Sequence, residues 1–106
     1  MSSSRIDSLK KFLEAEPGDT FAHYAIGLEY ASLQELQPAI EKFEEVITLD
    51  PNYVPAYHQL GLLFAKVNRK IDALKILEKG IEIAALCGDT HAKAEMAEAI
   101  DELGVA

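Results

Sequence analysis

The segments AIGLEYA at residues 25–31 and QLGLLFA at residues 59–65 decide the fold of this chain. Each places a large aliphatic residue and a glycine ahead of an aromatic residue, which is Tyr30 in the first segment and Phe64 in the second. Further pairs keep the same 34-residue step: Leu28 with Leu62, Ala39 with Ala73, and Phe43 with Leu77. A fixed period of this length indicates stacked supersecondary units. Such units usually present binding surfaces rather than catalyse reactions.

The repeated positions resemble the tetratricopeptide repeat. That 34-residue unit has a large residue at position 4, Leu-Gly at 7 and 8, and an aromatic residue at 11. It then has alanine at 20, a large apolar residue at 24, a small residue at 27 and proline at 32. In the first unit, residues 20–53, the pattern falls on His23, Ile26, Gly27, Tyr30, Ala39, Phe43, Val46 and Pro51. In the second, residues 54–87, it falls on Tyr57, Leu60, Gly61, Phe64, Ala73, Leu77, Gly80 and Ala85.

Three residues depart from the pattern: His23 is polar, Val46 is larger than usual, and Ala85 replaces the closing proline. His23 stands at a core-facing position, so it is interpreted as a packing histidine. The chain as a whole looks like a small protein of this family, of the bacterial type. The resemblance implies an all-α fold with about six helices, arranged as a right-handed superhelix of antiparallel helix pairs.

The segments around the two repeats are predicted to be helical as well. Apolar residues at helical spacing indicate an N-terminal half repeat over residues 5–17. Residues 89–103 are expected to form a C-terminal capping helix. The capping helix is expected to bury one face, made of Met96, Ala97, Ile100 and Leu103. Residues 1–106 are therefore predicted to form a single domain.

Local signals place individual residues within these helices. Asp19 is a good N-cap for the first helix of the first repeat, and Asn68 suits a left-handed corner in the second. Gly27 and Gly61 are expected to lie where the two helices of each pair cross, because a small side chain allows close approach. A tolerated glycine inside a helix would instead cost up to ~1 kcal/mol relative to alanine.

Composition limits the classes of partner. The 106 residues carry a net charge of −8, with one basic and seven acidic side chains over residues 18–51. Residues 52–87 carry five basic and three acidic side chains. An acidic protein repels phosphate backbones, so nucleic acid is excluded as a first expectation. No run of apolar residues approaches the ~20 of a membrane span, and the single cysteine indicates a cytoplasmic protein.

Few residues suggest chemistry. His91 and Glu95 have a spacing that can hold a metal ion from one helix face, but no nearby histidine or cysteine completes a ligand set. Cys87 has no base close to it in the sequence. Phosphate-binding loops and nucleophile elbows are absent. The sequence therefore predicts a protein that is not an enzyme and uses no metal and no cofactor.

The resemblance implies a concave groove lined by the first helix of each repeat. The residues expected to line it are Phe21, Tyr24, Leu28, His58, Leu62, Lys66, Glu98 and Asp101. Leu28 and Leu62 share one repeat position and would lie side by side, while Glu98, Asp101 and Glu102 would form an acidic rim. Apolar anchors beside such a rim suit a peptide or helix with apolar and basic residues.

Three alternatives remain open at this point. In the first, the leucines belong to packing between neighbouring helices and the remaining surface is an ordinary solvated one. In the second, the chain is a self-associating structural unit, a weak homo-oligomer in which the acidic first repeat meets the basic second one. An enzyme or metal protein would use His91, Glu95 or Cys87.

A subset of the family clamps the acidic carboxyl-terminal tails of chaperones through lysine, asparagine and arginine at fixed positions. Here those positions hold Tyr24, Leu28, Gln59, His91 and Glu95. The clamp is absent in the form that defines it.

Overall fold

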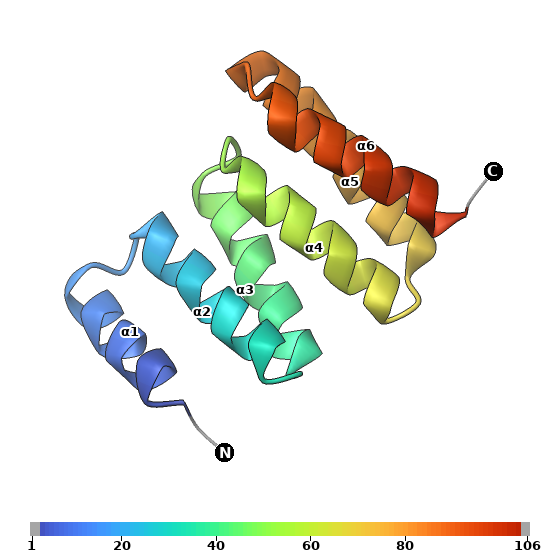
Figure 1. The fold of residues 1–106 in the computed structure, drawn as a ribbon. Coiled ribbons are helices and arrows are strands. Elements are labelled where there is room, and N and C mark those ends of the chain that lie inside the picture. The colour runs from blue at the N-terminus through green and yellow to red at the C-terminus, as the bar shows by residue number, and fades with distance from the viewer. Residues whose placement is uncertain (1–2, 105–106) are drawn as a thin grey trace. The chain divides into compact units, whose positions relative to one another are not determined.

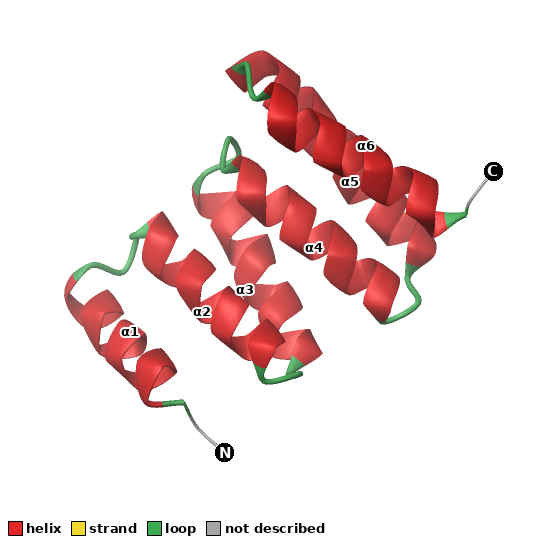
Figure 2. Cartoon of the chain, viewed as in Figure 1, coloured by secondary structure: helices red, strands yellow, loops and turns green. Residues whose placement is uncertain are grey.

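The computed structural model describes residues 3–104 and contains six helices and no strand over that range. The helices are α1 (Ser4–Ala15), α2 (Thr20–Ser32), α3 (Leu36–Leu49), α4 (Val54–Lys66), α5 (Lys70–Cys87) and α6 (Thr90–Leu103). Figures 1 and 2 show them joined by short loops. The predicted all-α class with about six helices is confirmed.

The chain divides into two compact units between Asp50 and Pro51. In the first unit, α2 packs against both α1 and α3. In the second unit, α4, α5 and α6 all pack against one another. The superhelix and the single domain predicted over both units stay predictions.

Side-chain caps and left-handed corners set the ends of several helices. The Asp19 carboxylate accepts a hydrogen bond from the Ala22 amide at 2.8 Å, which confirms its predicted role as the N-cap of α2. Gln34 and Asn68 occupy the corners after α2 and α4, with φ values of 61° and 64°. The predicted left-handed conformation of Asn68 is therefore confirmed.

The amide after each corner is paired in the same way. The Glu35 amide donates to the Tyr30 carbonyl at 2.9 Å, and the Arg69 amide donates to the Phe64 carbonyl at 2.7 Å. In each hydrogen bond the amide of residue i donates to the carbonyl of residue i−5. These bonds satisfy carbonyls that the end of the helix would otherwise leave unpaired.

Close helix approach at glycine builds the core of each unit. A Cβ on Gly27 would lie 2.7 Å from Cε1 of Phe43, and one on Gly61 would lie 2.5 Å from Cγ of Leu77. Both large side chains are fully buried. The prediction that these glycines admit the partner helix is confirmed, and the group that they admit is the large residue of the second helix.

Position 4 of each repeat holds a buried side chain that donates to a proline carbonyl. His23 is 5 % exposed, and its Nε2 lies 2.8 Å from the Pro17 oxygen. Tyr57 donates its hydroxyl proton to the Pro51 oxygen at 2.7 Å. Nε2 must carry a proton to make its bond, so Nδ1 of the neutral ring accepts from the Lys42 ammonium at 3.0 Å. The interpretation of His23 as a packing histidine is confirmed.

Polar contacts fix α1 onto α2. The Arg5 guanidinium lies 3.3 Å from the Glu29 carboxylate, and the Lys10 ammonium lies 5.7 Å from the ring centroid of Tyr30. The pKa of Lys10 is raised above its ordinary value. The main cause is a side-chain hydrogen bond with Tyr30, and the electrostatic interaction with the same residue is the second. Because Ile6 is the one residue of α1 that is buried, these contacts supplement a small apolar interface.

The buried face of α6 agrees with the expected one in part. Met96 and Leu103 are buried and Ile100 is half-buried, whereas Ala97 is exposed and Ala99 is buried instead. Because α6 packs against α4 as well as α5, its buried stripe follows the i, i+3, i+7 positions that face both helices. Gly80 permits this packing, since a Cβ there would lie 2.6 Å from both Cβ of Tyr57 and Sδ of Met96.

Candidate functional site

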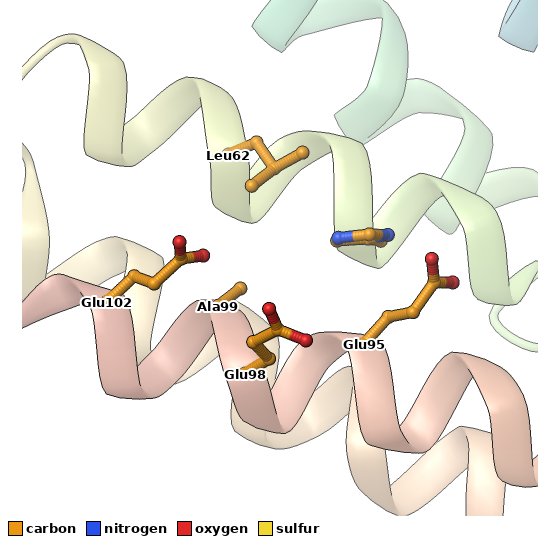
Figure 3. A pocket seen from close by; sticks show the side chains of 6 residues that line it. Leu62, Glu95, Glu98, Ala99 and Glu102 are labelled. Carbon is orange, nitrogen blue, oxygen red and sulfur yellow. The ribbon is translucent and has the colours of Figure 1, made fainter.

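A pocket of about 180 Å³ lies between α4 and α6 in the second unit. Its lining residues come from one face of each helix: His58 and Leu62 from α4, and Glu95, Glu98, Ala99 and Glu102 from α6. Figure 3 shows the three glutamate side chains extending from α6 toward α4, with Leu62 facing them. We refer to these six residues as the acidic pocket.

Helical spacing explains why these side chains meet. His58 and Leu62 are four residues apart on α4, while Glu95, Glu98 and Glu102 follow an i, i+3, i+7 spacing on α6. Residues at these separations share one side of a helix. Ala99 lies on the same side and is small, so it leaves space beneath the carboxylates.

The acidic pocket combines an apolar floor with a negative wall. Leu62 is 43 % exposed and offers carbon surface to a ligand, whereas Ala99 is 6 % exposed and contributes little accessible surface. The Glu95, Glu98 and Glu102 side chains are exposed, and an ionised carboxylate only accepts hydrogen bonds. The arrangement suits a lysine or arginine head next to an apolar group.

The structure brings together three of the eight predicted site residues, namely His58, Leu62 and Glu98. Lys66 lies in the last turn of α4 and Asp101 lies on α6, and both are exposed outside the lining. The sequence also placed Glu102 in the acidic rim, and this residue does line the pocket. Glu95 and Ala99 also line the pocket and are not among the eight predicted residues.

The other three predicted residues belong to α2 in the first unit. Phe21 is 66 % exposed and Leu28 is 39 % exposed, so neither is part of the core of that unit. Tyr24 is half-buried, with its ring centroid 5.5 Å from that of Phe43. These residues give α2 a partly exposed apolar stripe.

A signal for Glu95 was present in the sequence. Gly88-Asp89-Thr90 repeats Gly18-Asp19-Thr20 after 70 residues, two more than two full periods. The extra residues arise because α5 runs on to Cys87 before Gly88 adopts φ 75° and ends the helix. Helical spacing carried the signal, because Glu95 and Ala99 stand three residues before Glu98 and Glu102 and therefore share their side of α6.

The residues considered for chemistry lie on open surface. The His91 imidazole and the Glu95 carboxylate approach to 3.5 Å, and the His91 side chain is 86 % exposed. Cys87 is exposed at the end of α5. Over residues 3–104, no group of three or more histidine, cysteine, aspartate or glutamate residues is placed to hold a metal ion. Within the same range, no helix is long and apolar enough to cross a membrane.

Comparison with known proteins identifies the class of this helical repeat. A TPR repeat family model matches residues 27–68, and a tetratricopeptide repeat model matches residues 54–85. A tetratricopeptide repeat domain protein from Salinibacter ruber is 32 % identical over 80 % of this chain and 94 % of its own, with a TM-score of 0.76. The chain belongs to the tetratricopeptide repeat family.

More distant structures share the fold. The TPR2B domain of yeast Sti1, solved as a complex with pHsp70, has a TM-score of 0.87 at 19 % identity, covering 92 % of this chain and 78 % of its own. A Bordetella parapertussis protein has a TM-score of 0.83 at 20 % identity, covering 97 % and 89 %. Among curated proteins, none matches the chain significantly. The family fold is typical of protein–protein interaction modules and is generally non-enzymatic.

Proposed function

We propose that this protein is a non-enzymatic interaction module that binds a short segment of a partner protein on the first-helix surface of its repeats. The acidic pocket is the observation that carries this function, because it places Leu62 and Ala99 beside three glutamates in one concavity. An apolar anchor with a charged surround is the usual composition of a binding spot. The partner segment carries an apolar side chain flanked by lysine or arginine.

Fold and charge support this proposal separately. The yeast Sti1 domain was solved with pHsp70, so the fold can hold a protein partner. The wall of the acidic pocket carries the opposite charge to the clamp that selects acidic tails, which favours a basic segment here. With few repeats, the contact is expected to bury less than ~1,200 Å² in total, which is typical of transient complexes.

Charge and apolar contacts make different contributions to such a complex. Exposed carboxylates attract a basic segment over distances of up to ~10 Å at 0.1 M salt, so they raise the association rate. Leu62 loses water only when the partner is docked, so it sets the lifetime of the complex. The affinity is therefore expected to fall as salt rises, mainly through slower association.

Site-specific photo-crosslinking in the source cells tests the proposed function. A photoreactive amino acid replaces Leu62 in one variant and Lys79, on the exposed surface of α5, in a control variant. Crosslinks that form from position 62, and that disappear when Glu98→Lys is added, would support the proposal. Equal crosslinking from both positions would contradict it, and a crosslink to a second copy of the chain would show self-association instead.

A further inference from the structure

The side chains of the acidic pocket restrict the conformation of its ligand as well as its charge. Three of the six lining residues are glutamates, and Leu62 and Ala99 have no polar side-chain atoms. A carboxylate accepts hydrogen bonds and donates none when ionised. The His58 imidazole is therefore the one lining side chain that can donate.

An extended peptide would be poorly satisfied in this pocket. Each of its residues brings a carbonyl that needs a donor and an amide that needs an acceptor. The glutamates can accept from the amides, but the carbonyls would have to share His58 or remain with water. Leaving a buried polar group unpaired costs about 1–3 kcal/mol.

A helix avoids this cost because its backbone groups already bond to one another. It presents side chains alone, and a lysine or arginine brings the donors that the carboxylates can accept. The lining residues of the acidic pocket are therefore suited to the outer face of a helix.

The spacing of the glutamates favours the same ligand. Glu95 to Glu102 spans seven residues of α6, or about 10 Å along the helix axis. A helix aligned with α6 repeats this rise, so basic residues at i, i+3 or i+4, and i+7 lie level with the three carboxylates. In an extended strand, three side chains on one face spread over about 13 Å, because alternate residues are 6.6 Å apart.

We infer that the acidic pocket receives an amphipathic helix of the partner, an inference that rests on the proposed function. Lysine or arginine at i, i+3 or i+4, and i+7 of this helix faces Glu95, Glu98 and Glu102. An apolar residue beside that basic row packs against Leu62 and Ala99. The complex is a pairing of helix faces whose charges are complementary.

Selection from two phage-displayed peptide libraries tests the inference. Both vary the same positions of a 16-residue frame, but one frame is alanine-based and forms a helix. The other has prolines at two interior positions, where proline costs about 3 kcal/mol of helix stability. The immobilised wild-type protein selects the peptides, and the Glu98→Lys protein removes those that bind elsewhere.

The expected result is enrichment from the helical library alone, with basic residues at the stated spacing. The best peptide is then titrated by fluorescence anisotropy. Glu98→Lys should weaken binding at least tenfold, which corresponds to about 1.4 kcal/mol. Glu78→Lys makes the same charge change on the exposed surface of α5, outside the pocket, and should change the affinity by less than about twofold.

Each other outcome overturns a specific statement. Enrichment from the proline library of basic peptides that are sensitive to Glu98→Lys would overturn the helical ligand and leave the proposed function standing. Enrichment of helical peptides that lack lysine or arginine at the stated spacing would overturn the charge pairing. If neither library yields a peptide sensitive to Glu98→Lys or Leu62→Asp, both the inference and the proposed binding surface fail.

Discussion

The α2–α3 and α4–α5 pairs build one repeat with different side chains. His23 and Tyr57 occupy the same position and both donate to a proline carbonyl six residues earlier. The imidazole also uses its second nitrogen, which accepts from Lys42. The repeat therefore specifies a hydrogen bond at this position rather than a residue type.

The two pairs differ most where α6 packs. The twenty-seventh position of the 34-residue repeat is Val46 in the first unit, and this valine is fully buried. The equivalent residue of the second unit is Gly80, and Met96 of α6 together with Tyr57 occupies the adjoining space. The absence of a side chain at Gly80 therefore leaves room for Met96 of α6 beside the backbone of α5.

The exposed surfaces of α2 and α4 differ for a related reason. Leu28 and Leu62 are exposed to a similar degree, 39 % and 43 %. Tyr24 packs against its own unit through Phe43, whereas His58 lines a pocket whose other wall is α6. The acidic side chains of the pocket all come from the capping helix, and α4 contributes His58 and Leu62.

The largest expected effect tests the packing at Gly80. Gly80→Ala should destabilise the protein by about 2–3 kcal/mol, because overpacking of a tight core costs ~1–3 kcal/mol. The added methyl group would lie 2.6 Å from Cβ of Tyr57, an atom attached directly to the backbone that cannot rotate away. Urea unfolding monitored by circular dichroism measures the loss.

Gly18→Ala is the matched control, because nothing lies within 4 Å of a Cβ at that position. Its stability should stay within about 0.5 kcal/mol of wild type, as for most surface substitutions. Equal unfolding midpoints for Gly80→Ala and Gly18→Ala would show that α6 adjusts freely and would remove the contrast with Val46.

The next effect concerns binding by the equivalent leucines. Leu62→Asp should weaken the selected basic peptide at least tenfold, or about 1.4 kcal/mol, by removing the apolar anchor. Leu28→Asp should have a smaller effect on the same peptide, because Leu28 is not a lining residue of the acidic pocket. Fluorescence anisotropy gives both affinities.

Both leucines are half-exposed, so each aspartate variant should remain folded with a loss of less than about 1 kcal/mol. Thermal unfolding checks this before the affinities are compared. A Leu62→Asp protein that folds and binds normally would place the binding surface elsewhere on the molecule.

A smaller effect is expected from the hydrogen bond at position 4. Tyr57→Phe removes the hydroxyl alone and should cost about 1 kcal/mol, the typical net value of one such bond. His23→Ala should cost more, because it removes the ring packing and the Lys42 contact in addition to the bond with Pro17. Denaturant midpoints of the two variants provide the comparison, and a neutral Tyr57→Phe would show that water replaces the hydroxyl.

The smallest effect is an expected absence of binding. A synthetic acidic chaperone tail should bind no more tightly than ~1 mM, or about −4 kcal/mol. Tyr24 and Leu28 replace the cation and amide of the clamp, and Glu95 and Glu98 repel the carboxylates of the ligand. A titration with a dissociation constant near 1 μM, about −8 kcal/mol, would contradict both the absence of the clamp and the preference of the pocket for basic segments.

The candidate site could be predicted from the sequence in part. His58 and Leu62 followed from their repeat positions, because an unbroken helix keeps the same face toward the same side. Asp101 was expected in the lining, and Ala97 was expected to be buried, on a face of α6 inferred without its neighbours. The structure leaves both residues exposed. Asp101 precedes Glu102 by one residue, or about 100° of helical turn, so the two side chains leave α6 on different sides.

The sequence by itself determined the repeat, the helices and the points of close approach. The 34-residue period, Asp19 and Asn68 as end signals, and the glycines opposite Phe43 and Leu77 depend on local chemistry and on residue size. Only the tertiary structure decided which side of α6 is buried and which carboxylates meet α4. That choice depends on packing α6 against two helices at once, and the sequence of α6 alone does not state where those helices lie.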